Sequence, residues 1–177
     1  MWKGVVVSIQ VAARGGAALA PVAEVRAVAG RGLVGDRYHD RRGTYSERPG
    51  NGRSATLIET ETLEALRRDH RLELSPAETR RNFAIRDVPL NHLVGRRFRV
   101  GEVLLEGVRL CEPCLHLESL TRSGVREALV HRGGLRAEIL STGTIRVGDS
   151  VRPEPEPFTH RAARSRAPRP TRRRDPP

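Results

Sequence analysis

Apolar and polar residues alternate along much of the chain with the two-residue period of β-strands. Residues 2–9 are dense in β-branched side chains, and residues 22–28 alternate as a half-buried strand does. The same criteria predict further strands at residues 56–58, 83–85, 97–100, 103–110 and 135–140. Gly143 and Gly148-Asp149 punctuate a last hairpin. The pattern therefore predicts a chain of many short strands.

Helical patterns are few and short. Residues 59–68 combine apolar positions at helical spacing with an acidic start and a basic end. Ser75-Pro76-Ala77-Glu78 has the composition of a capping box and predicts the start of a second helix. A third is predicted at residues 125–130, ended by Gly133-Gly134. Many short strands with little helix favour a closed or nearly closed β-barrel over a layered βαβ fold.

Length and composition divide the chain into a domain and a tail. The 177 residues are sufficient for one ordinary domain, which we place at residues 1–152. Residues 153–177 are rich in proline and arginine and poor in large apolar side chains, so we expect a disordered tail. The 1–152 segment holds no run of about 20 apolar residues and no secretion signal at its start. We expect a cytoplasmic protein that does not enter a membrane.

The net charge of +11 raises the possibility of nucleic-acid binding. From Arg152 onward, eight arginines and three acidic residues give +5, which leaves 11 − 5 = +6 on the rest of the chain. Lys3 is the only lysine, and a coding bias toward arginine explains that skew without selection for a polyanion. Aromatic residues, which stack on bases, make up only 3% of the chain. Nucleic-acid binding by the tail, residues 161–174, is kept as a rival hypothesis.

The candidate chemistry centres on Cys111 and Cys114, which follow a predicted strand and flank Glu112-Pro113. Two cysteines cannot form the disulfide framework of a small secreted domain, so both are expected as free thiols. Nearby arginine favours the thiolate, which is the nucleophilic and metal-binding form of cysteine. A soft thiolate suits a transition metal such as molybdenum, or a transferable sulfur held as a persulfide.

Three other interpretations of this pair stay open. The cysteines are half of a zinc site if His116 and His131 complete the four ligands. They form a thioredoxin-like redox pair if the first cysteine begins a helix in a βαβ setting. They are buried structural residues if they pack only as small apolar side chains.

Two polar clusters accompany the cysteines. The glycine-bounded loop at residues 32–39 contains Gly35, Asp36 and Arg37, and it is either a ligand-binding loop or an ordinary turn. Arg80-Arg81-Asn82 offers guanidinium donors and an amide that suit a phosphate-bearing ligand, or it is a solvated polar segment.

Six short motifs in sequence resemble the MOSC domain, the C-terminal domain of molybdenum-cofactor sulfurases. The match runs from about Val5 to Val151. The motifs are G-L-V-G-D-R-Y at 32–38, T-L-I-E at 56–59, R-R-N at 80–82, C-E-P-C at 111–114, H-R-G-G at 131–134 and G-x-I-x-x-G-D at 143–149.

This resemblance implies a mainly β fold similar to the pyruvate-kinase β-barrel, with a few short helices. It implies a cysteine that ligates the molybdenum of molybdenum cofactor or receives sulfur from a pyridoxal-phosphate cysteine desulfurase. That role carries to Cys114, with Cys111 as the second candidate. The cofactor-binding residues carry over to Gly35, Asp36, Arg37, Arg80, Arg81, Asn82 and His131.

The resemblance implies two related activities. One is reduction of N-hydroxylated small molecules, as in some stand-alone members, with electrons from a partner protein. The other is a cofactor-free sulfur carrier with a persulfide on Cys114. Because Lys3 does not stand in a pyridoxal-phosphate context, the sulfur has to come from a partner desulfurase.

Overall fold

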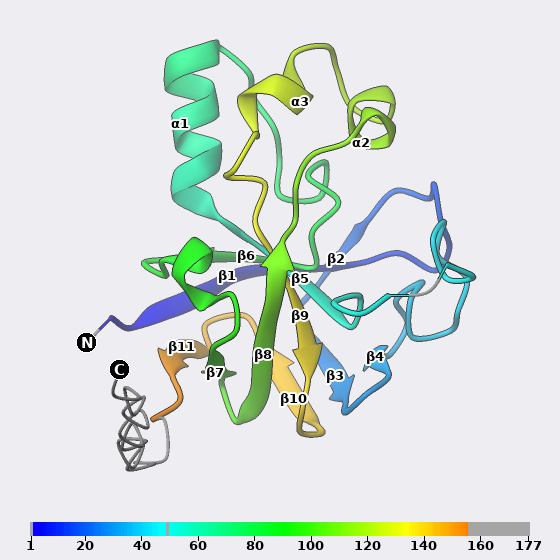
Figure 1. Cartoon of the computed structure of the whole chain (residues 1–177), viewed down its shortest axis with the longest axis vertical. Helices are drawn as coiled ribbons and strands as arrows, with labels where there is room; N and C mark the ends of the chain where they lie inside the picture. The colour runs from blue at the N-terminus through cyan, green and yellow to red at the C-terminus, as the bar shows by residue number, and fades with distance from the viewer. Residues whose placement is uncertain (1, 49, 156–177) are drawn as a thin grey trace, which may run out of the picture.

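A computed structural model describes residues 2–48 and 50–155. Strands make up most of the regular secondary structure in these residues (Figure 1). The strands are β1 (Gly4–Val11), β2 (Ala20–Val22), β3 (Glu24–Val28), β4 (Gly32–Leu33), β5 (Ala55–Glu59), β6 (Phe83–Arg86), β7 (Arg97–Val100), β8 (Val103–Leu110), β9 (Leu135–Ile139), β10 (Gly143–Arg146) and β11 (Ser150–Pro153). The helices are α1 (Thr60–His70), α2 (Leu115–Ser119) and α3 (Val125–Ala128), with a 3₁₀ turn η1 (Leu90–Leu93).

Seven strands close into a barrel in the order β11-β7-β8-β9-β5-β6-β1, and β1 pairs with β11 to complete the ring. Closure leaves these strands without a free edge. The predicted mainly β barrel with few helices is confirmed. The predicted strand at residues 22–28 is two strands, because β2 pairs with β1 while β3 joins a small sheet with β10 and β4.

The odd number of strands forces one parallel neighbour pair, because seven strands cannot alternate in direction around a closed ring. That pair is β5 and β6, and all the other pairs of the barrel are antiparallel. A parallel pair needs a long crossover connection. Here the connection consists of α1 and the polar loop that follows it.

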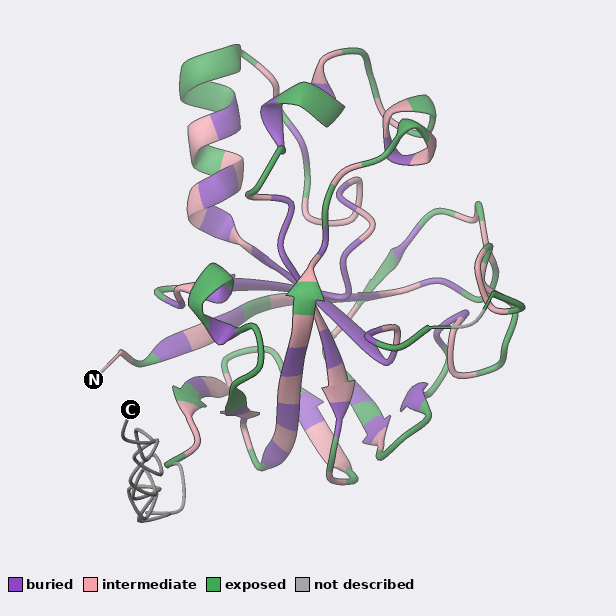
Figure 2. Ribbon diagram, in the orientation of Figure 1, coloured by how far each residue is buried: buried purple, intermediate pink, exposed green. Residues whose placement is uncertain are grey.

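The barrel core and the helices are joined through the two faces of β5 and β6. Leu57, Phe83 and Ile85 point into the barrel core, whereas Ile58 and Ala84 pack with α1, α2 and α3 in a second apolar cluster. Both faces of these strands are thus buried, which explains their continuous apolar sequences. Figure 2 shows the buried strand segments converging below the three helices. The helices cover one end of the barrel.

The prediction of a helix starting at Ser75 is wrong, although the hydrogen bonds of a capping box are present. The Ser75 N–H donates to Glu78 Oε2 at 2.8 Å, and the Glu78 N–H donates to Ser75 Oγ at 3.4 Å. The segment forms only successive turns in which an N–H donates to the carbonyl three residues earlier. In the last of these turns, the Arg80 N–H donates to the Ala77 carbonyl. Arg80 has φ 66°, a left-handed conformation that ends the turns before a helix can propagate.

The other helices agree in part with the sequence prediction. The predictions at residues 59–68 and 125–130 are confirmed by α1 and α3, whereas α2 and η1 were not predicted. None of the helices in residues 2–48 and 50–155 has the length and apolarity that a membrane crossing requires. Of the predicted tail, residues 156–177 lie outside the described residues, and Pro153 pairs with Phe98 as the end of β11.

Gly134, directly before β9, allows the chain to pass close to the backbone of β5. It has φ 102°, and a Cβ there would lie 2.0 Å from the Leu57 carbonyl oxygen. We expect Gly134→Ala to lower the free energy of unfolding by about 4 kcal/mol or more, because both backbones would have to move. Gly148, with φ 90° and open space around its Cβ position, is the matched control. Gly148→Ala should cost about 1 kcal/mol. Equal losses in urea denaturation would contradict this account.

Candidate functional site

The candidate site lies at the end of the barrel where several strands meet at one level. Leu110 of β8 pairs with Leu135 of β9, Leu135 pairs with Leu57 of β5, and Leu57 pairs with Phe83 of β6. The segments next to these residues therefore leave the barrel together. They include three of the motifs singled out in the sequence: residues 80–82, 111–114 and 131–134.

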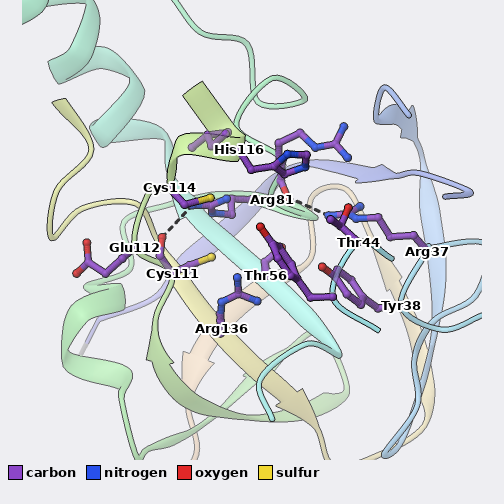
Figure 3. A pocket seen from close by; sticks show the side chains of 13 residues that line it. Arg37, Tyr38, Thr44, Thr56, Arg81, Cys111, Glu112, Cys114, His116 and Arg136 are labelled. Carbon is purple, nitrogen blue, oxygen red and sulfur yellow. Dashed lines mark hydrogen bonds between the residues drawn. The ribbon is translucent and has the colours of Figure 1, made fainter. Parts of the chain in front are cut away.

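A small cavity of about 70 Å³ opens among these segments (Figure 3). Its lining is polar and cationic and includes both thiols. The lining residues are Arg37, Tyr38, Thr44, Tyr45, Thr56, Arg80, Arg81, Cys111, Glu112, Cys114, His116, Leu117 and Arg136.

The two cysteines of the cavity differ in accessibility. Cys111 is 1% exposed, and its N–H donates to the Gly134 carbonyl at 2.7 Å, which continues the β8–β9 pairing by one step. Cys114 is exposed and precedes α2 in extended conformation, with φ −139°. Its carbonyl accepts the Glu118 N–H at 3.2 Å. Of the two thiols, Cys114 is the one that a ligand or partner can reach.

Arg81 fixes the position of the cysteine loop. Its side chain is buried, and its guanidinium donates to three carbonyl oxygens: Cys111 at 2.9 Å, Gly133 at 2.8 Å and Thr79 at 2.9 Å. These bonds join the crossover loop, the cysteine loop and the turn before β9. Arg81 lines the cavity, but these three hydrogen bonds commit its guanidinium to the protein itself.

Asp36 and Asn82 form a buried polar network behind the cavity wall. Asp36 Oδ1 accepts from Asn82 Nδ2 at 3.1 Å and from Arg37 Nη1 at 3.0 Å. Asn82 Oδ1 accepts from both the N–H and the hydroxyl of Thr56, at 3.2 and 2.8 Å. The network ties the loop after β4 to β5 and β6. Neither Asp36 nor Asn82 lines the cavity.

Arg37 and Arg80 reach the cavity with part of their hydrogen-bonding capacity committed to the protein. Arg37 Nη2 donates to the Arg80 carbonyl at 3.2 Å, and Arg80 Nη1 donates to the Ala17 carbonyl. Burial lowers the pKa of Arg80, and the nearby charge of Arg37 lowers it further. Together with Arg81 and Arg136, these two guanidiniums give the cavity its positive character.

His131 and Gly35 lie outside the cavity lining. The His131 side chain is 80% exposed, and both its N–H and its Nδ1 contact the Glu112 carboxylate, at 2.9 and 3.0 Å. Partial burial acts to raise the pKa of Glu112, but these bonds outweigh it and the pKa is lowered. His131 thus contacts the cysteine loop from outside. Gly35 is an exposed turn residue with φ 82°. Cofactor binding by these two residues stays a prediction.

Tyr45 and His116 stand beside Cys114 in the cavity lining. His116 was considered from the sequence only as a zinc ligand, and Tyr45 was not identified at all. Their rings are 6.3 Å apart in an edge-to-face arrangement. Burial raises the pKa of the Tyr45 phenol, and the neighbouring Cys114 raises it further. The phenol is therefore protonated at neutral pH and available as a hydrogen-bond donor near the thiol. No local sequence pattern marks Tyr45 as a site residue, because its loop is far from Cys114 in the chain.

Arg136 was also missed. It belongs to β9, whose neighbouring residues Leu135 and Ala137 face the barrel core, so its side chain points outward into the cavity (Figure 3). Its Nε is buried and has no hydrogen-bond partner. An arginine between apolar strand residues is the signal that was available.

The zinc interpretation lacks a ligand set in the described part of the chain. No group of three or more His, Cys, Asp or Glu side chains there is arranged to hold a metal ion. His116 lines the cavity, whereas His131 is engaged with Glu112 outside it.

Residues 44–152, more than half of the chain, match the family model of the MOSC domain. A search of the curated proteins found no match.

Three solved structures show the same fold. The YuaD protein from Bacillus subtilis aligns with a TM-score of 0.72 at 15% identity, over 85% of this chain and 97% of that one. YiiM from Geobacillus stearothermophilus gives 0.66 at 14% identity, over 86% and 75%. YiiM from Escherichia coli gives 0.60 at 18% identity, over 88% and 71%. At these identities the likeness extends to the fold alone.

We expect the thiols to differ in reactivity. N-ethylmaleimide should modify Cys114 in the native protein about a hundredfold faster than Cys111, because the buried thiol reacts only after local opening. Peptide mass spectrometry would identify the modified residue, and both thiols should react together in denaturant. Native labelling of Cys111 at a similar rate would refute the assignment.

Arg81→Met should lower the free energy of unfolding by about 3 kcal/mol, because it leaves buried carbonyls without donors. Arg126 is exposed on α3, and Arg126→Met should change stability by no more than about 0.5 kcal/mol. Urea denaturation measures both. An Arg81→Met protein as stable as the control would show that these bonds do not hold the loop.

Proposed function

Because the chain belongs to the MOSC domain family, we propose that Cys114 is its reactive thiol and ligates the metal of molybdenum cofactor. The observation that carries this proposal is the contrast between the two thiols of one cationic cavity. Cys111 is buried and holds the strand pairing, whereas Cys114 is exposed at the cavity. A soft thiolate is a suitable ligand for such a metal.

The residues present fit the metal end of this cofactor. They offer an exposed thiol, and the buried Nε of Arg136 is a donor without a partner inside the protein. The cavity of about 70 Å³ is smaller than the 300–1,000 Å³ of typical sites for organic ligands. It therefore suits a metal centre and its small ligands, and the pterin part of the cofactor would have to bind outside it.

Each side chain around the thiol has a separate task. When bound, the cofactor supplies two-electron redox chemistry of the kind that reduces N-hydroxylated compounds. Tyr45 holds a proton on its phenol oxygen beside Cys114 and can donate it in a hydrogen bond to the thiolate or to a ligand. Arg81 orients the loop through its bond to the Cys111 carbonyl. Leu117, buried in α2, limits water access from the helix side.

A second candidate is a sulfur carrier without the cofactor, and the small size of the cavity favours it. In that reaction the Cys114 thiolate attacks the outer sulfur of a persulfide on a partner desulfurase. The new S–S bond leaves the sulfur on Cys114 and releases the partner's cysteine as a thiolate. The partner is required, because Lys3, the only lysine, is exposed in the segment before β1 and far in sequence from the cavity residues.

Elemental analysis of protein expressed in a host that makes molybdenum cofactor separates these candidates. We expect molybdenum in the wild type and in Cys111→Ala, and its loss in Cys114→Ala. Retention of molybdenum in Cys114→Ala would contradict the ligand assignment. If all three proteins lack molybdenum while Cys114 accepts sulfur from a desulfurase, the carrier function replaces the cofactor function.

A further inference from the structure

Arg136 lies in an electrostatically unfavourable position. In the β8–β9 pair it is directly opposite Arg109, and like charges facing each other across a strand pair are destabilising. Burial lowers the pKa of Arg109, and the charge of Arg136 lowers it further. The protein therefore keeps two mutually repelling guanidiniums next to its reactive cavity.

The acidic residue nearest along the same strand face does not relieve this repulsion. Glu138 is two residues from Arg136 on β9, but its carboxylate accepts hydrogen bonds from the Gly52 N–H and the Ser54 hydroxyl. Arg136 Nε remains buried without any partner. Leaving a buried donor without a partner is costly, and such a donor in a folded protein calls for an explanation such as a bound ion or ligand.

The side chain of Arg136 lies in the cavity that contains the two thiols. Its guanidinium rises from β9 into the space beside Cys111 and Thr56, in the cavity that Cys114 also lines (Figure 3). Arg37, Arg80 and Arg81 line the cavity too, but each donates to main-chain carbonyls. Among the arginines that line this cavity, Arg136 is thus the one with a buried donor that has no partner in the described residues.

We propose that Arg136 is an anion-binding residue and that the molecule which binds in the cavity beside Cys114 carries an oxyanion, either a carboxylate or a phosphate. A guanidinium can bind either group through two parallel hydrogen bonds, one of them from Nε. A cavity of about 70 Å³ accommodates such a small group. This inference deepens the proposed function, and its substrate statement rests on Cys114 being the reactive thiol.

Alkylation of Cys114 tests the proposal without any cofactor. Iodoacetate and iodoacetamide both transfer a carbon to the thiolate and release iodide, but only iodoacetate carries a carboxylate. Because the neutral reagent reports the ionisation and exposure of the thiol, the ratio of the two rates isolates the effect of reagent charge. Mass spectrometry of the Cys114 peptide in the full chain gives both rates.

We expect Arg136→Gln to lower the iodoacetate-to-iodoacetamide ratio about tenfold, the effect of losing one charge-assisted hydrogen bond. Arg126→Gln removes the same charge from an exposed helix position and should leave the ratio unchanged. An equal ratio in Arg136→Gln and wild type, or an equal fall in both variants, would overturn the proposal.

Titration of the full chain, labelled with ¹⁵N in arginine, distinguishes the two anion classes. Inorganic phosphate and acetate are added separately, and the Nε–Hε signal lost in Arg136→Gln is followed. A saturable shift with one anion and not the other identifies the class, and no saturable shift with either overturns the proposal. The titration is repeated in Cys114→Ala. If the shift persists while the metal analysis fails, the anion site stands and only the role of Cys114 is lost.

Discussion

The buried guanidinium of Arg81 is the constraint on which the candidate site depends. A charge inside a protein is costly unless its donors are satisfied, and here the Arg81 guanidinium donates to three main-chain carbonyls. Those carbonyls belong to the crossover loop, the cysteine loop and the turn before β9. One side chain therefore sets the relative positions of three segments that are distant in sequence, and it keeps Cys111 in the barrel wall while Cys114 reaches the surface.

The topology of the barrel explains why these segments meet. Seven strands in a closed ring require one parallel pair, and the crossover that joins β5 to β6 has to pass over one end of the barrel. The helices that cover this end use the outward residues Ile58 and Ala84 of the same two strands as their packing surface. The crossover returns to the barrel through Arg80, Arg81 and Asn82, directly beside the cysteine loop. The crossover that closure requires thus brings residues 80–82 beside the cysteine loop.

Local patterns in the sequence were sufficient for most strands of the barrel and for the choice of a barrel, because alternation and β-branching follow burial directly. They did not separate β2 from β3, which belong to different sheets. They failed at Ser75-Pro76, where a correct capping box precedes a left-handed Arg80 that only the tertiary fold imposes. The cysteine pair and Arg80-Arg81-Asn82 could be found as motifs. The different roles of these residues could not be predicted, because they depend on whether each side chain points into the protein or toward the cavity. Tyr45 and Arg136 come from distant segments and enter the site only through folding.

The most direct test of the proposed metal ligand is X-ray absorption spectroscopy at the molybdenum edge on cofactor-loaded protein. A cysteine sulfur in the metal's coordination shell should be present in the wild type and in Cys111→Ser, and absent in Cys114→Ser. A spectrum that loses this sulfur in Cys111→Ser and keeps it in Cys114→Ser would contradict the account, because it would make the buried thiol the ligand.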